Sequence, residues 1–404
     1  MADLFTFSNP SPVPSATSGP LAGLRVVVQP NLSVQGWPCP AGSPALAGYT
    51  ALSHATVVTR LAQAGAVLAG SSRMAELGLG LAGDTTARVL AEGRADLALI
   101  NDTIGEARAA AAGAGLFGFK PSWGLVSRCG LTGLVPSMES IGLVAADPAP
   151  IIAALAVMAG PDPEDPSIPE DCAAGFRAQQ PPLTGVRIAG VIQECVDNMD
   201  HTQRNAFEEG LARLGATGVT TRMVNLDQDD LFADVHHIVA AVEASSSAGK
   251  YDGVRYGHRS PAGKNWNEMV LNTRSESFGP LIKPFLFQGA YFQFHNYSAF
   301  ENACRIRGRL VQATSDMLGQ VDMLVAPTCR PAHDPARATT IEATYAAFGL
   351  TLPANVTGLP VLQVPSPARA PGTDFGLQLI GKRCDDAGLL AIGLALSSAA
   401  REGR

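Results

Sequence analysis

The chain has 404 residues, of which 46% are hydrophobic and 16% are charged, and its formal net charge is −7. This composition can supply a large apolar core, and the absence of lysine- or arginine-rich tracts argues against direct binding of nucleic acid. No apolar run approaches the ~20 residues that span a bilayer. The N-terminal MADLFTFSNPSPVPSATSG also lacks the basic-then-apolar order of a secretory signal. We therefore expect a cytoplasmic protein without a membrane segment.

Cysteine and histidine usage gives little support for metal chemistry. The seven cysteines are scattered and include no Cys-x-x-Cys pair, a pattern that favours reduced thiols over a disulfide framework or a zinc site. His236 and His237 fall in a predicted helix, where one faces inward and one outward, and histidines satisfied by local contacts are commoner than ligand pairs. We expect neither a metal nor a cofactor.

Residues 1–18, rich in proline and serine, are expected to form a flexible lead-in. Beyond them, apolar runs alternate with amphipathic ones, which indicates a sheet buried on both faces. The patterns predict strands at 24–30, 66–72, 96–102, 186–192, 220–226, 323–328, 361–367 and 375–381, and helices at 54–65, 85–95, 201–216, near 298–320 and near 385–400. We predict an α/β fold with a single large α/β/α domain.

Several segments, in order, resemble the amidase signature family. They are GPLAGLRVVVQPNLSVQGWPCPAGSPALAGY (19–49), ATVVTRLAQAGAVLAGSSRMAELG (55–78), NDTIGEARAAAAGAGLFGFKP (101–121), WGLVSRCGLTGLVPSMESIG (123–142), VDMLVAPT (321–328), TLPANVTGLPVLQVP (351–365) and GLQLIGK (376–382). The resemblance implies one amidase-signature-like domain, residues 19–404, around a large mixed β-sheet. Within the family, EASSSAGKYDGVRYGHRS (243–260) and RSESFG (274–279) resemble glutamyl-tRNA amidotransferase A subunits, which hydrolyse glutamine and pass ammonia to a partner.

The family's catalytic positions carry different residues in this chain. Family members use a serine nucleophile, a bridging serine in a cis peptide and a lysine that accepts the proton. The resemblance places Ser71 at the lysine, Ala82 at the bridging serine and Glu106 at the nucleophile. Ser71 cannot act as a base, Ala82 cannot relay a proton, and an ionised Glu106 would repel a developing oxyanion. Losing such a unit removes about 10⁴–10⁶ in rate.

The loop that binds substrate in the family matches this chain more closely than the catalytic positions do. Asp102, Thr103, Gly105 and Arg108 match its pattern, and the resemblance implies an oxyanion cradle made by the backbone N–H groups from Ile104 to Glu106. We expect these six residues to line the binding site. Two alternatives are open for Glu106. In the first, its carboxylate lies in or beside the cradle, or contacts Arg108. In the second, it points to solvent.

Three functional hypotheses follow. The favoured one is an amidase-like pseudoenzyme that binds a small amide, a carboxylate or a partner protein without hydrolysing it. The alternative is an active amidase that acts on carbon–nitrogen amide bonds with non-standard residues, of which Glu106, Asp102 and Ser72 are to be tested first. The third is a non-catalytic component of an amidotransferase-like complex, bound to a small helical subunit or to a second copy of itself.

Overall fold

The computed structural model describes residues 3–12, 18–169, 172, 176, 187–197, 199–226, 230–329, 333–366 and 376–402. An 11-stranded sheet runs through them in the order β1-β3-β2-β4-β6-β5-β10-β11-β9-β7-β8. The strands are β1 (Phe5–Ser8), β2 (Arg25–Val28), β3 (Val67–Ser72), β4 (Leu97–Asp102), β5 (Phe117–Lys120), β6 (Ser140–Ala145), β7 (Arg187–Ile192), β8 (Val219–Val224), β9 (Met323–Pro327), β10 (Val361–Val364) and β11 (Leu377–Gly381).

The sheet is mixed, as predicted. Strand β2 pairs in parallel with β3 and β4, and β7 pairs in parallel with β8 and β9. The other neighbours are antiparallel. The helices are α1 (Thr56–Gln63), α2 (Thr86–Ala91), α3 (Glu106–Ala114), α4 (Pro148–Met158), α6 (Gln193–Asp197), α7 (His201–Ala216), α8 (Leu231–Ser247), α9 (Trp266–Ser277), α10 (Ile282–Phe294), α11 (Tyr297–Leu318), α12 (Ile341–Phe348), α13 (Leu352–Thr357) and α14 (Asp386–Glu402).

Strand β4 shows why both faces of the sheet are covered. All six of its residues are buried, and successive side chains of a strand point to opposite faces. Leu97 and Leu99 belong to the apolar cluster that includes α4, whereas Ala98 and Ile100 belong to the cluster that includes α2 and α3. The predicted single α/β/α domain around a mixed sheet is therefore confirmed.

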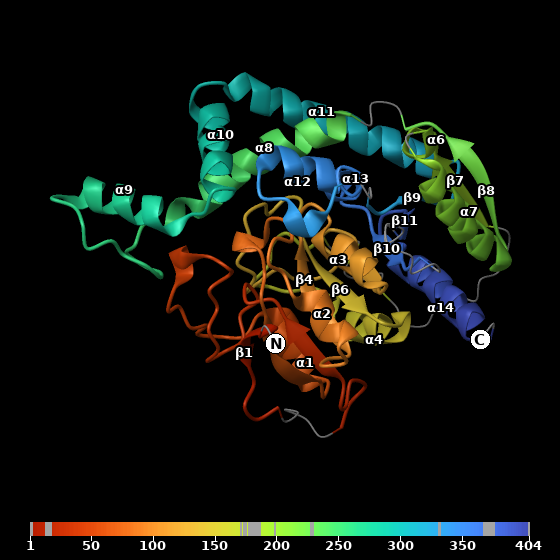
Figure 1. The fold of residues 1–404 in the computed structure, drawn as a ribbon, viewed down its shortest axis with the longest axis horizontal. Helices are drawn as coiled ribbons and strands as arrows, with labels where there is room; N and C mark the ends of the chain where they lie inside the picture. The colour runs from red at the N-terminus through yellow and green to blue at the C-terminus, as the bar shows by residue number, and fades with distance from the viewer. Residues whose placement is uncertain are drawn as a thin grey trace.

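A helical layer made of α8, α10 and α11 lies along one side of the molecule, and α9 extends away from it (Figure 1). Helix α10 packs closely on α8, because a side chain at Gly289 would overlap the carbonyl of Ala241. The inner face of α10 is thus fixed against α8, and its outer face is left for solvent or a partner.

Two expectations differ from the structure. The lead-in was expected to be flexible, but Phe5–Ser8 forms β1, an edge strand paired antiparallel with β3; residues 13–17 lie outside the described part. The expectation of reduced thiols is wrong for Cys172 and Cys384, which form a disulfide across 212 positions. Sequence spacing alone could not show this pair, because the fold brings together two segments that lie far apart in the chain.

Candidate functional site

The candidate site lies where β4 ends and α3 begins. The buried run Leu97–Asp102 lies inside the sheet between β2 and β6, and residues 103–105 turn the chain into α3. Gly105 makes the turn possible: its φ is 119°, and a Cβ there would overlap the hydroxyl of Thr351. Only glycine adopts this conformation without strain. The turn therefore directs its backbone N–H groups toward the first residue of α3.

The carboxylate of Glu106 occupies the cradle. Its Oε2 accepts hydrogen bonds from the backbone N–H groups of Thr103 (2.7 Å), Ile104 (2.8 Å) and Gly105 (3.1 Å). Its Oε1 accepts a fourth from Gly80 (2.9 Å). The residue is 1% exposed, so the cradle, and not solvent or Arg108, receives the side chain. The donors start one residue earlier than expected, because the side chain folds back over the turn before it.

Opposing influences act on the protonation of Glu106. Burial, aided by the charge of Asp102, raises its pKa to about 8, while backbone N–H groups favour the anion. The group therefore changes charge near neutral pH. A carboxyl group with such a pKa can exchange protons with a substrate or with water.

Asp102 and Arg108 form a fully buried ion pair beside this turn. Arg108 Nη2 lies 2.9 Å from Asp102 Oδ1, and Nε lies 3.2 Å from Oδ2. Burial is the largest influence and would raise the pKa of Asp102, but the charge and hydrogen bonds of Arg108, with the charge of Lys120 and the hydrogen bond from Asn355, together outweigh it, and the pKa is lowered. Arg108 also donates to the carbonyl of Thr351 (2.9 Å) and to Asn355. The pair ties the end of β4 to α13 and does not contact the Glu106 carboxylate.

His236, on α8, holds the other side of the turn. Its Nε2 lies 3.0 Å from the carbonyl oxygen of Thr103, and its Nδ1 lies 2.9 Å from the hydroxyl of Tyr345. Because a carbonyl only accepts, Nε2 carries the proton and Nδ1 accepts from Tyr345. Burial lowers the pKa of His236 to about 3, so the ring stays neutral. His236 faces inward and His237 contacts Gln288, as expected for satisfied histidines.

The other two positions that the resemblance aligned with catalytic residues lie on neighbouring segments. Ser71 is buried in β3, and its Oγ has no hydrogen-bond partner in the described part of the chain. Ala82 is half-buried in the loop that contains Gly80, whose N–H reaches Glu106. Ser72, a residue to test under the alternative hypothesis, hydrogen-bonds Thr86 (Oγ to Oγ1, 2.7 Å). The structure thus brings the Ala82 loop to Glu106, and no described hydrogen bond joins Ser71 to Glu106.

Sequence reasoning missed Lys120. It ends β5, whose four residues are all buried, and its Nζ donates to the carbonyl of Pro121 (3.0 Å). Burial lowers its pKa to about 7, against the attraction of Asp102. The available signal was a lysine directly after the apolar run FGF. A lysine that is buried together with such a strand is rare unless it has a partner, so its position indicates an unusual environment.

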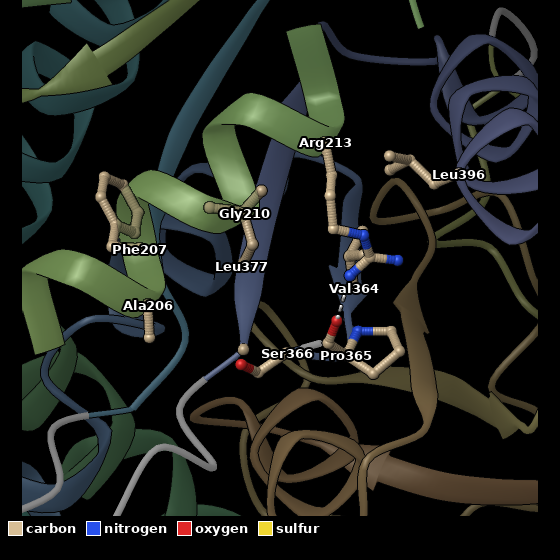
Figure 2. Close-up of a pocket in the computed structure, with 10 residues that line it drawn as sticks. Ala206, Phe207, Gly210, Arg213, Val364, Pro365, Ser366, Leu377 and Leu396 are labelled. Carbon is tan, nitrogen blue, oxygen red and sulfur yellow. Dashed lines mark hydrogen bonds between the residues drawn. The ribbon is translucent and has the colours of Figure 1, made fainter. Parts of the chain in front are cut away.

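The hollow in Figure 2 offers no chemistry of its own. It lies between α7, β10, β11 and α14, and its volume is about 10 Å³, room for one water. Arg213 points into it and donates to the carbonyl of Pro365 (3.3 Å). Within the described ranges no group of three His, Cys, Asp or Glu side chains could hold a metal ion, and no helix is long and apolar enough to cross a membrane.

These features define the class of the protein: an α/β protein with a large mixed sheet and a backbone N–H cradle at the β4–α3 turn. The family model described as Amidase matches residues 11–89 and 86–390, and the chain belongs to this family. Solved structures agree. The A subunit of glutamyl-tRNA(Gln) amidotransferase from Thermotoga maritima has a TM-score of 0.78 at 22% identity, over 97% of this chain and 86% of that one. An amidase has a TM-score of 0.73 at 26% identity, over 94% and 85%.

Within the family, the chain is similar in sequence to amidotransferase A subunits. The glutamyl-tRNA(Gln) amidotransferase A subunit of Haloarcula marismortui is 32% identical over 95% of this chain and 97% of its own length. The corresponding A subunit of Natronomonas pharaonis is 33% identical over 94% and 96%. The similarity therefore extends along nearly the whole of both chains.

Proposed function

We propose that this chain acts on carbon–nitrogen amide bonds, as a cytoplasmic protein similar to amidotransferase A subunits. The end-to-end similarity to these A subunits carries the proposal. The comparisons favour this alternative over the pseudoenzyme hypothesis preferred from the sequence, because the similar proteins are amidotransferase subunits, an amidase and hydrolases such as the 6-aminohexanoate cyclic dimer hydrolase.

The proposed chemistry takes Ser71, Ala82 and Glu106 as the replaced catalytic positions and does not use a serine nucleophile. Glu106 leaves the cradle and accepts a proton from water, whose oxygen attacks the amide carbon. The freed N–H groups then receive the oxyanion, and Glu106 returns the proton to the leaving nitrogen. Burial in the cradle raises the pKa of Glu106 to about 8, so the resting side chain holds a proton near neutral pH; outside the cradle the carboxyl group releases this proton and acts as the general base. The buried resting position requires that substrate binding displaces the carboxylate.

Ammonia release tests this proposal. Purified chain is incubated with glutamine, asparagine and a panel of small amides, and ammonia is measured. Glu106→Gln should lower any turnover by about 10²–10⁴, the usual contribution of a general base. Glu92→Gln is the matched control, because Glu92 is exposed and pairs with Arg88 on the surface. Absence of ammonia release from the wild-type chain, alone and with its partner, would overturn the proposal.

A second candidate, the non-hydrolytic protein, is favoured by one observation. The chain's own carboxylate uses the four backbone donors of the cradle and is buried over them. This candidate predicts that a ligand raises the melting temperature without ammonia release. It also predicts that Glu106→Ser restores nothing, since Ser71 and Ala82 remain.

A partner protein is the second part of the proposal, and the outer face of α10 supports it. Phe287, Tyr291 and Phe294 are 75%, 53% and 73% exposed and lie at helical spacing on one stripe. Beside them is a hollow of about 470 Å³ between α9 and α10, whose charged lining residues are Arg274 and Lys283. An amphipathic helix with acidic side chains complements this surface in apolarity and charge.

Native mass spectrometry tests the partner. Tagged chain purified from its own host should carry a small helical subunit, and Phe287→Asp should lose it without loss of folding. Leu52→Asp is the matched control, because Leu52 is also an exposed apolar side chain. A buried position such as Phe207 is not suitable for this purpose. A homodimer that persists in Phe287→Asp would contradict the proposed surface.

A further inference from the structure

The cradle around Glu106 joins two separate segments through one carboxylate. One oxygen takes the three N–H groups of the β4–α3 turn, and the other takes the N–H of Gly80 in the loop before α2. Four convergent donors match the acceptor capacity of a carboxylate. The arrangement fits a carboxyl group in shape and in the number of hydrogen bonds that it accepts.

The cradle is held in place by neighbours other than Glu106. Thr351 donates its hydroxyl to the carbonyl of Ile104, and His236 donates to the carbonyl of Thr103. Gly80 and Gly105 have φ values of 82° and 119°, which turn the flanking peptides into a concave arrangement of N–H groups. Because these contacts do not involve residue 106, the three donors of the turn should keep their positions when its side chain is shortened, whereas the Gly80 loop loses the hydrogen bond that fastens it to the turn.

We propose that this cradle is a carboxylate-binding site whose resident ligand is the chain's own Glu106, and that a free monocarboxylate binds there when the side chain is removed. The site takes a planar acid group on a short apolar stem. Its occupant links the Gly80 loop to the β4–α3 turn. This inference needs no turnover, so it stands or falls separately from the proposed hydrolysis.

Side-chain replacement and chemical rescue test the site. Glu106→Ala removes a methylene and a carboxylate, and acetate has the same two carbons. Sodium acetate should raise the melting temperature of Glu106→Ala by on the order of 2 °C over sodium chloride at equal ionic strength. Glu106→Gly, which lacks one more carbon, should prefer propionate. The wild type and Glu106→Gln keep the cradle filled and should not respond.

Controls separate specific binding from salt effects. The surface variant Glu92→Ala should show no preference for acetate over chloride. If Glu106→Ala is insoluble, its refolding yield in acetate against chloride replaces the melting temperature, and a higher yield in acetate supports the proposal. Folded Glu106→Ala that responds equally to acetate and chloride would overturn it. An equal acetate response in the wild type would do so as well.

Discussion

The carboxylate of Glu106 and the backbone N–H of Gly80 are joined by a 2.9 Å hydrogen bond between residues 26 positions apart in the chain. The same carboxylate also accepts from the three residues before it. One side chain therefore closes the β4–α3 turn and fastens the Gly80 loop to it. The stability of the protein and its dependence on pH should both respond to changes at this turn.

Removing the carboxylate should destabilise the fold. Glu106→Ala leaves four buried N–H groups without their acceptor, and each unsatisfied group costs about 1–3 kcal/mol before water enters or the loop relaxes. We expect a loss of at least about 2 kcal/mol in the free energy of unfolding, measured by urea denaturation. Glu106→Gln keeps the shape and one acceptor oxygen, so it should lose less. Equal stability of Glu106→Ala and wild type would contradict the described contacts.

The stability of the wild type, compared with that of Glu106→Gln, should decrease as the pH rises. The pKa of Glu106 is 4.5 in its ordinary state and about 8 in the fold. Between these values the folded state holds a proton that the unfolded state has released, so stability decreases as pH rises from about 4.5 to about 8 and is level above it. Urea denaturation of both proteins at pH 5, 6, 7 and 8 measures the difference.

Lys120 acts in the opposite direction at higher pH. Its pKa is about 7 in the fold against 10.5 ordinarily, so its contribution to stability rises between those values. It is present in both the wild type and Glu106→Gln and largely cancels in their difference. If the stability of the wild type relative to Glu106→Gln increased from pH 5 to 8, the pKa of Glu106 would be lowered in the fold and not raised.

Breaking the buried Asp102–Arg108 ion pair should lower the free energy of unfolding more than breaking an exposed ion pair. Arg108→Leu leaves Asp102 buried without its cation, and such losses cost about 3–5 kcal/mol. Arg25 and Asp96 form a matched control pair, since both are more than a third exposed, and Arg25→Leu should cost about 1 kcal/mol or less. Denaturation of both variants measures the contrast, and similar losses would show that Asp102 is protonated or solvated.

Glycine at position 105 should be irreplaceable, whereas glycine 113 should not. Gly105→Ala places a methyl group on the Thr351 hydroxyl at a φ of 119°, and we expect a loss of about 2 kcal/mol or more. Gly113 lies inside α3, which begins directly after Gly105, and has open space around it. Gly113→Ala should therefore gain up to about 1 kcal/mol from helix propensity. Thermal denaturation of the two variants compares them, and a tolerated Gly105→Ala would contradict the described close approach of Gly105 to Thr351.

Local sequence patterns determined where the regular elements lie. The strand expected at 96–102 is β4 (Leu97–Asp102), and the helix expected near 298–320 is α11 (Tyr297–Leu318). Apolar periodicity sets these elements because side chains of one face share one environment. The residue types at positions 71, 82 and 106 were likewise plain from the sequence, and their correspondence to the family's catalytic positions stays a prediction.

Tertiary structure alone decided where the Glu106 carboxylate points, which donors receive it and how its pKa moves. Gly80, Thr351 and His236 reach the turn from parts of the chain 26 to 247 residues away, and no local pattern links them to it. The burial of Lys120 and the Cys172–Cys384 disulfide have the same origin. Hydrogen bonding and desolvation depend on distance in space, and only the folded chain sets that distance.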